Sequence, residues 1–118
     1  MPHLQVQLAA DELDGTVEPR LIASLTDAIV SVYGEWARPI AVVEIDPIAT
    51  GRSGVGGTRT AVAPILTMGV RAAALLPPEG DARAAALIDA LTSAVGAVLG
   101  APTAERTTVV VRPEEGEG

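Results

Sequence analysis

The residue with the clearest chemical potential is Pro2, which directly follows the initiator methionine in the opening stretch MPHLQVQL. If Met1 is removed, the nitrogen of Pro2 becomes a secondary amine at the end of the chain, where it can act as a base or a nucleophile. No internal residue supplies that group. A proline is also tolerated at the first residue of a β-strand, because no ladder hydrogen bond is required of it there. Both interpretations stay open until the rest of the chain is considered.

The charged residues narrow the chemistry further. All eight basic residues are arginines, whose planar guanidinium suits a carboxylate or a phosphate, and the net charge is −7. His3 is the only histidine and cysteine is absent, which excludes a multi-histidine or thiolate metal site and a cysteine–histidine triad. A cluster of carboxylates remains possible as a metal site, but no spacing of acidic residues favours one, so we expect no metal. A negative chain with only Tyr33 and Trp36 as aromatic residues is also a poor binder of nucleic acid.

Length and composition favour one domain that spans residues 1–118. The absence of cysteine fits a reducing compartment. The first residues lack the basic flank and apolar run of a signal peptide, and no stretch reaches the roughly eighteen apolar residues of a spanning helix. We expect a cytoplasmic protein that does not enter a membrane.

Hydrophobic periodicity predicts a strand, a helix and a second strand in the first half. Residues 3–8 alternate between apolar and polar, and Pro19 begins an amphipathic stretch that ends at Gly34. The apolar positions of that stretch are Leu21, Ile22, Leu25, Ile29 and Val32. Residues 39–45 are rich in β-branched side chains, which is typical of a strand. The first half is therefore predicted to be a βαβ unit.

The second half repeats this unit. The stretch LIASLTDAIVSVYG, which begins at Leu21, aligns without a gap with LIDALTSAVGAVLG, which begins 66 residues later at Leu87. The two stretches share a threonine and the terminal glycine, and the same offset carries Pro47 to Pro113. Residues 64–70, a proline followed by an alternating stretch, repeat the start of the chain. We infer a duplication.

The domain therefore divides into repeat one, residues 1–62, and repeat two, residues 63–118. Each βαβ crossover is expected to be right-handed, which places both helices on one face of a four-stranded sheet. The predicted fold class is α+β, a mixed sheet with two helices on one face. Apolar residues on the uncovered face, such as Ile65, Val43 and Ala41, would favour a homo-oligomer; the alternative is a monomer with an ordinary exposed face.

Together these features resemble the tautomerase superfamily. The resemblance rests on the proline behind Met1, the amphipathic helix, the β-branched strand and the glycine-rich stretch DPIATGRSGVGG at residues 46–57. It covers the whole chain. Short members, the 4-oxalocrotonate tautomerases, carry one βαβ unit per chain, whereas macrophage migration inhibitory factor and its relatives carry two. The resemblance to the two-unit members implies an α/β sandwich, a homotrimer and a catalytic amino-terminal proline.

The glycine-rich stretch predicts a hairpin rather than a nucleotide site. The order of its glycines matches neither G-x-G-x-x-G nor the P-loop pattern, and no helix follows to supply a dipole. Glycines here instead provide positive φ angles and close backbone approach in a hairpin that packs against a neighbouring subunit. The glycines concerned are Gly51, Gly54, Gly56 and Gly57.

The resemblance makes Pro2 a general base. Burial disfavours the charged form of an amine and lowers its pKa from about 8 toward neutrality, so that the neutral amine can accept a proton. The implied reaction is keto–enol tautomerisation, or a 1,3- or 1,5-proton shift, in a small 2-oxo or enol carboxylate without a cofactor. Pro64 cannot share this role, because the nitrogen of an internal proline is an amide.

A 2-oxo acid also needs groups that hold its carboxylate and stabilise an oxyanion, for which arginine is suited. The two arginines of the 4-oxalocrotonate tautomerases are missing here. By resemblance the substrate-binding candidates are Arg71, near the third-strand arginines of related dehalogenases, Arg52, beside the glycines, and Arg38, near a pocket lysine of migration inhibitory factor. Each could instead be a solvated surface arginine. Tyr33 and Trp36 either line the pocket mouth or pack within their own subunit.

Two other functions stay open. Hydration or hydrolytic dehalogenation of an unsaturated acid would need a protonated proline and a carboxylate that activates water. Glu44 and Asp46 are candidates for that carboxylate, although solvation at a strand edge also explains both. The missing arginines favour a second alternative, a catalytically degenerate family member with a binding or structural role. His3 could tune the neighbouring amine or simply lie at an interface or the surface.

Overall fold

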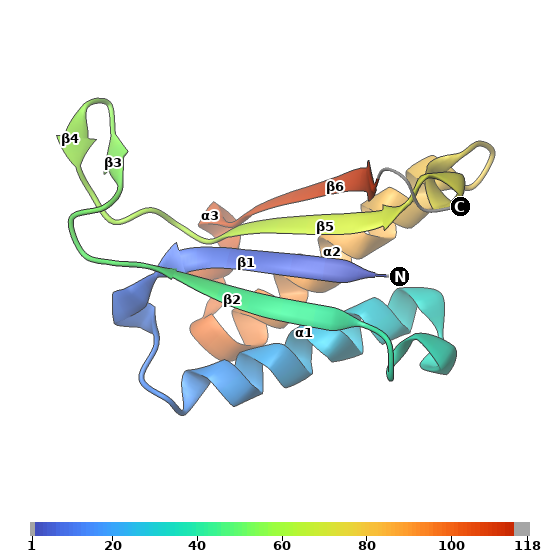
Figure 1. Cartoon of the computed structure of the whole chain (residues 1–118), viewed down its shortest axis with the longest axis horizontal. Helices are drawn as coiled ribbons and strands as arrows, with labels where there is room; N and C mark the ends of the chain where they lie inside the picture. The colour runs from blue at the N-terminus through green and yellow to red at the C-terminus, as the bar shows by residue number, and fades with distance from the viewer. Residues whose placement is uncertain (1, 115–118) are drawn as a thin grey trace.

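A four-stranded sheet and two long helices make up most of the protein, and a small hairpin projects from one end of the sheet (Figure 1). The computed structural model describes residues 2–114. The strands are β1 (His3–Ala9), β2 (Val42–Ile48), β3 (Gly54–Val55), β4 (Thr58–Arg59), β5 (Ile65–Arg71) and β6 (Thr108–Glu114). The helices are α1 (Val17–Tyr33), α2 (Gly80–Leu99) and α3 (Ala101–Arg106), and the 3-10 turns are η1 (Ala10–Glu12), η2 (Glu35–Ala37) and η3 (Ala72–Leu75).

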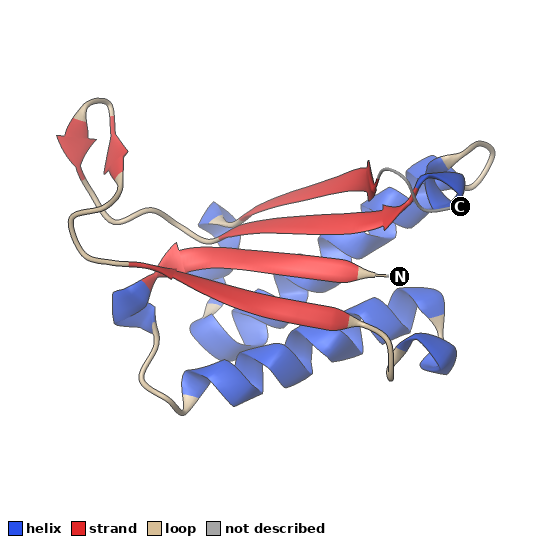
Figure 2. Ribbon diagram, in the orientation of Figure 1, coloured by secondary structure: helices blue, strands red, loops and turns tan. Residues whose placement is uncertain are grey.

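The main sheet has the strand order β2-β1-β5-β6. The pairs β1–β2 and β5–β6 are parallel, whereas the two central strands, β1 and β5, are antiparallel. A helix joins the strands of each parallel pair, and Figure 2 shows both long helices on the same face of the sheet. The predicted α+β fold, a mixed four-stranded sheet covered on one face, is confirmed.

The core lies between the sheet and the two long helices. Alternate side chains of β1 and β5 point into it and meet one apolar stripe from each helix. The most deeply buried of these are Leu4, Val6, Leu8, Leu66, Met68 and Val70 from the strands, with Leu21, Leu25, Ile29, Leu87, Leu91 and Val95 from the helices. By length and composition alone α2 could cross a membrane, but its buried stripe belongs to this core.

The two units start their strands with equivalent backbone contacts. The amide of Val42 donates a hydrogen bond to the carbonyl of Pro2, and the amide of Thr108 donates one to the carbonyl of Pro64, each over 3.1 Å. The proline that opens each unit therefore has the same structural role in both. This role alone does not distinguish the strand-starting interpretation of Pro2 from the chemical one.

Pro47 and Pro113 lie in the two outer strands, β2 and β6. The amides of Val42 and Thr108 point toward the central strands, so strand alternation directs the backbone nitrogens at positions 47 and 113 away from the sheet. A proline there removes no hydrogen bond from the ladder. Both prolines are thus compatible with strands because the strands are at the edges.

The glycine-rich stretch forms the β3–β4 hairpin, as predicted. Gly56 and Gly57 connect the paired residues Val55 and Thr58, and their φ angles are +60° and +81°. A tight two-residue turn of this kind requires positive φ at both positions, which glycine adopts without a steric penalty. Because β2 runs parallel to β1, the hairpin that follows it leaves the sheet at the end opposite the amino terminus (Figure 1).

The second strand of repeat one begins later than predicted. The β-branched pattern predicts residues 39–45, whereas β2 spans Val42–Ile48. The amides of Ile40 and Ala41 both donate to the carbonyl of Ala37, at 3.0 and 2.8 Å, so the turn after α1 continues to residue 41. Local turn hydrogen bonds here override the strand propensity of the side chains.

The uncovered face of the sheet differs in part from the prediction. Ile65 lies on it and is 37% exposed, as expected. The prediction for Ala41 and Val43 is wrong, because both pack against the core instead. The outward position of β2 is the adjacent Val42, and in a strand a shift of one residue moves a side chain to the other face.

Leu25 and Ile22 provide a matched test of how α1 packs. Both belong to the apolar stripe predicted for the helix, but Leu25 is fully buried and Ile22 is 40% exposed. We expect Leu25→Ala to lower the free energy of unfolding by about 2–5 kcal/mol, because it leaves a cavity. Ile22→Ala should cost about 0.5 kcal/mol or less. Urea unfolding followed by circular dichroism measures both, and equal losses would contradict this placement of α1.

Candidate active site

Pro2 is buried at the end of the sheet where β1 begins and β5 ends. The antiparallel register pairs His3 with Gly69, so the residue before His3 faces Val70 and Arg71. In Figure 1 the amino terminus and the end of β5 lie on the same side of the molecule. The pairing of the two repeats therefore brings Pro2 next to a cationic side chain that is distant in the sequence.

A cavity of about 160 Å³ lies at this point. Three of its lining residues come from repeat one beyond Pro2, and three come from the end of β5 and the turn that follows. The full lining is Pro2, Tyr33, Trp36, Ile40, Val70, Arg71 and Ala74. Arg71 is the one formally charged side chain among these described residues, and the other walls are aromatic or aliphatic. The cavity thus combines a proline, a single cation and apolar surface.

Tyr33 and Trp36 form the aromatic wall of the cavity. The helix α1 ends at Tyr33, where Gly34 adopts a φ of +111° and its amide donates to the carbonyl of Val30 at 2.7 Å. Trp36 then folds back onto Tyr33. The two rings meet edge to face with centroids 5.9 Å apart, and Nε1 of Trp36 donates to the Tyr33 carbonyl at 2.8 Å. The two aromatic residues therefore pack within their own subunit and also line the cavity.

Tyr33 and the neighbouring Arg83 determine the electrostatics of this wall. Burial raises the pKa of the Tyr33 phenol, and the positive charge of Arg83 partly offsets that effect. Nη1 of Arg83, in the first turn of α2, donates to the carbonyl of Ala74 at 2.6 Å. Since Ala74 lines the cavity, this bond ties the start of α2 to the cavity wall.

Arg38 is not among the described residues that line the cavity. Its guanidinium donates to Glu35 from Nε at 3.0 Å and from Nη2 at 3.1 Å, and to Asp27 from Nη1 at 2.8 Å. The hydrogen bonds that Arg38 donates to Glu35, and then to Asp27, raise the pKa of Arg38, and the same contact with Arg38 lowers the pKa of Glu35. These contacts link α1 to the turn that carries Trp36.

Arg52 lies in the loop that leads to the β3–β4 hairpin, where its amide donates to the carbonyl of Ala49 at 3.0 Å. The hairpin is at the end of the sheet opposite Pro2 (Figure 1). Of the three candidate arginines, Arg71 therefore lines the Pro2 cavity within a single chain, whereas Arg38 and Arg52 do not.

His3 and Glu44 lie on the uncovered face of the sheet rather than in the cavity. Nε2 of His3 is 2.7 Å from Oε1 of Glu44, and both side chains are about half exposed. Nε2 of Gln5 makes a longer contact of 3.4 Å with Oδ2 of Asp46 on the same face. Both acidic candidates for activating water are thus engaged away from the Pro2 cavity.

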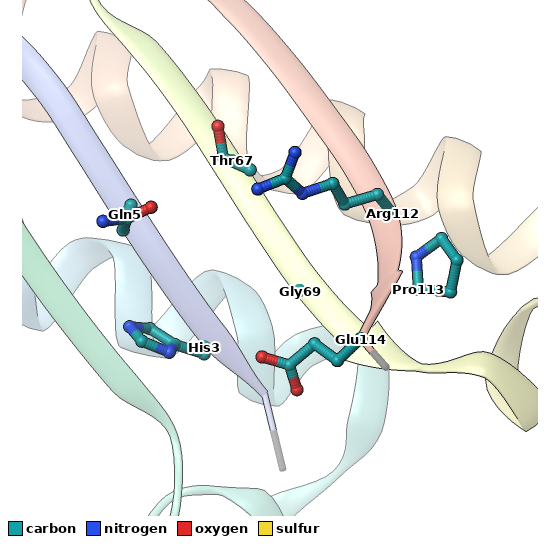
Figure 3. Close-up of a pocket in the computed structure, with 7 residues that line it drawn as sticks. All are labelled: His3, Gln5, Thr67, Gly69, Arg112, Pro113 and Glu114. Carbon is teal, nitrogen blue, oxygen red and sulfur yellow. The ribbon is translucent and has the colours of Figure 1, made fainter. Parts of the chain in front are cut away.

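The uncovered face also holds a polar groove of about 530 Å³ (Figure 3). Its lining consists of His3, Gln5, Thr67, Gly69, Arg112, Pro113 and Glu114. The Glu114 side chain lies over Gly69, since a Cβ on that glycine would be 2.7 Å from Oε2 of Glu114. Within residues 2–114, no group of three or more histidine, aspartate or glutamate side chains is arranged to hold a metal ion.

Periodicity alone did not identify three residues of the cavity as lining residues. Ile40 and Ala74 belong to irregular turns, and Val70 shows the alternation of an ordinary core position. Their proximity to Pro2 follows from the antiparallel pairing of β1 with β5. The duplication is the sequence feature that could have indicated this proximity. If the first strands of the two repeats pair in antiparallel fashion, the start of β1 lies beside the end of β5.

Comparison with known structures identifies the fold. No protein-family model and no curated protein matches the sequence significantly. The structure matches a fused 4-oxalocrotonate tautomerase described as a wild-type asymmetric trimer, with a TM-score of 0.81 and 28% identity over 98% of this chain and 90% of that one. A native fused 4-oxalocrotonate tautomerase matches with a TM-score of 0.78 and 26% identity over 95% of this chain and 86% of that one. The chain belongs to the tautomerase superfamily, in its two-unit fused form.

The two-unit tautomerase fold extends to more distant proteins. Macrophage migration inhibitory factor from Toxoplasma gondii matches with a TM-score of 0.70 and 12% identity, over 95% of this chain and 89% of that one. At this identity the similarity concerns the fold alone.

Gly34 provides a test of the turn that builds the aromatic wall of this tautomerase-superfamily chain. Gly34→Ala should lower the free energy of unfolding by about 1–2 kcal/mol, because a residue with a Cβ is strained at positive φ. It should also shift the emission of Trp36, the only tryptophan. Gly15→Ala is a matched control, since Gly15 has a φ of +91° and precedes α1. A similar emission shift in both variants, or in neither, would contradict the role of Gly34.

Proposed function

We propose that this protein is a cofactor-independent tautomerase that moves a proton within a small 2-oxo or enol carboxylate, with Pro2 as the base. The observation that carries this proposal is the position of buried Pro2 in a small, mainly apolar cavity beside Arg71. Structural similarity to fused 4-oxalocrotonate tautomerases at 28% and 26% identity supports it.

The environment of Pro2 favours a neutral amine. We expect Met1 to be removed, because the residue that follows it is small, and the Pro2 nitrogen then becomes a secondary amine. Burial and the nearby positive charge of Arg71 both disfavour the protonated form of that amine. A neutral secondary amine in a mainly apolar cavity is available as a general base.

Arg71 is positioned to hold the substrate carboxylate. A planar guanidinium binds a carboxylate through two parallel hydrogen bonds, and such bonds are stronger in an apolar cavity than in water. Because Arg71 and Pro2 line the same cavity, a carboxylate held by Arg71 places the adjacent 2-oxo or enol group near the amine.

The proposed reaction needs no co-reactant. The Pro2 nitrogen takes the proton of the enol hydroxyl, and the oxygen forms a carbonyl as the electron pair of the carbon–carbon double bond moves to the terminal carbon. That carbon then takes the proton back from the protonated Pro2. One O–H bond is exchanged for one C–H bond, so the enol becomes its keto isomer and the base is regenerated.

Hydration and hydrolytic dehalogenation have less support. Both need a carboxylate that activates water, and none of the described residues that line the cavity has one. Glu44 and Asp46 lie on the uncovered face of the sheet, where Glu44 contacts His3 and Asp46 contacts Gln5. The geometry therefore favours proton transfer over the addition of water.

We also propose that the chain forms a homotrimer. One fused 4-oxalocrotonate tautomerase with a similar structure is described as a trimer. The uncovered sheet face and the projecting hairpin of this chain supply surfaces for such an assembly (Figure 1). In an assembly the hairpin of one subunit could bring Arg52 toward a Pro2 cavity of another, which a single chain does not allow.

The direct test of the base is Pro2→Ala, with Pro64→Ala as a matched control in the second repeat. Ketonisation of phenylenolpyruvate and 2-hydroxymuconate, followed by ultraviolet absorbance at neutral pH, should fall by about 10²–10⁴-fold in Pro2→Ala. It should change little in Pro64→Ala, because that nitrogen is an amide.

The intact mass of each sample is measured to check that Met1 is absent. Undiminished ketonisation by Pro2→Ala would remove Pro2 as the base. A wild type that lacks activity toward both enols, with Met1 absent, would instead favour the binding or structural alternative.

Arg71→Ala tests the carboxylate site, with Arg20→Ala as the control because Arg20 is exposed on α1. A charge-assisted hydrogen bond between Arg71 and the substrate carboxylate contributes about 1.5–3 kcal/mol. Its loss in Arg71→Ala should therefore raise KM for either enol by about 10- to 100-fold. Arg20→Ala should leave KM unchanged. Equal KM values for wild type and Arg71→Ala would exclude Arg71 as the carboxylate ligand.

A further inference from the structure

Tyr33 supplies the only hydroxyl among the described residues that line the Pro2 cavity. It is the last residue of α1, and its ring is held in place by the edge-to-face contact with Trp36. The indole N–H of Trp36 is already bonded to the Tyr33 carbonyl, so it is not available to a ligand in this arrangement. The phenol of Tyr33 is thus the neutral side-chain donor that the cavity offers.

The proposed reaction leaves one requirement that Pro2 and Arg71 do not meet. When the enol loses its proton, negative charge develops on its oxygen, and a positioned donor stabilises that charge most where water is excluded. Pro2 takes the proton and Arg71 holds the carboxylate. The enolate oxygen, on the carbon next to the carboxylate, therefore needs a third group that donates a hydrogen bond to it. Tyr33 lines the same cavity and carries such a donor.

The surroundings of Tyr33 suit a hydrogen-bond donor. Burial raises the pKa of the phenol, so the group keeps its proton throughout the neutral range. The positive charge of Arg83 partly offsets this effect of burial, which makes the O–H group a better donor to an anion. Arg83 is itself anchored to the cavity wall through the Ala74 carbonyl at 2.6 Å.

We propose that the Tyr33 hydroxyl is a further catalytic group, which donates a hydrogen bond to the enolate oxygen while Pro2 holds the transferred proton. This inference rests on the proposed tautomerase function. Tyr33 keeps its own proton throughout, so the proton still moves from the enol oxygen to Pro2 and then to carbon. The phenol stabilises the charge between the two transfers.

Tyr33→Phe tests this role because it removes the hydroxyl and preserves the ring. Thr26→Val is the matched control, since it removes a hydroxyl of the same helix that donates to the carbonyl of Ile22, at 2.8 Å. With phenylenolpyruvate as the probe, Tyr33→Phe should lower kcat by about 10²-fold and leave KM nearly unchanged, because the lost bond forms mainly in the transition state. Thr26→Val should match the wild type.

A second measurement uses the fact that Tyr33 is the only tyrosine of the chain. Growth on 3,5-difluorotyrosine replaces this one phenol with a more acidic one, which ionises at a lower pH. A donor is present below the pKa of the phenol and lost above it. In the fluorinated protein kcat should therefore fall as pH rises through the phenol titration, seen by phenolate absorbance, while the unsubstituted protein stays active there.

The outcomes separate this inference from the proposed function. A wild type without ketonisation activity overturns the proposed function and this role together. An active wild type with an unchanged kcat in Tyr33→Phe, or a change in KM alone, overturns the role of Tyr33 only. A fall of the same size in Thr26→Val overturns it too, because the loss would then come from the helix. The role of Tyr33 is also overturned if kcat of the fluorinated protein does not change with pH across the phenol titration.

Discussion

The antiparallel pairing of β1 with β5 is the contact on which the rest of the structure depends. It joins the two βαβ units into one sheet and aligns their apolar stripes under both helices. It also places the start of β1 against the end of β5, so that Pro2 and Arg71 line the same cavity. The core and the candidate site thus depend on the same strand pairing. A shift in this register would expose core leucines and separate Pro2 from Arg71 at the same time.

The residues differ in how far the sequence alone could place them. Alternation over β1 and the proline behind Met1 were enough to predict a strand with Pro2 at its start. Arg71 was a candidate only through resemblance, and its contact with the cavity depends on the pairing of the repeats. The expectation for Val43 is wrong because the register of β2 with β1 pairs Val43 with the core residue Leu4, and side-chain propensity does not reveal that register. Arg83 contacts the cavity wall through the Ala74 carbonyl, a contact that no motif encodes.

The second repeat keeps the scaffold of the first but lacks the residues of its candidate site. Pro64 repeats the backbone contact of Pro2 but is an internal residue. Leu99 ends α2 where Tyr33 ends α1, and Ala9 ends β1 where Arg71 ends β5. The pseudo-equivalent end of the sheet therefore lacks the amine, the phenol and the cation together. Each chain carries one candidate site, and the second unit has become the support that completes the cavity of the first.

The outward-facing prolines of β2 and β6 protect both edges of the main sheet against aggregation. An unprotected sheet edge is a template on which strands can add without limit, as they do in amyloid. Pro47 and Pro113 interrupt that template at matching points on both edges, since neither offers an amide to an incoming strand. Strand addition at these edges is confined to the residues before each proline. Continuous growth of strands into a fibre at these edges is therefore disfavoured.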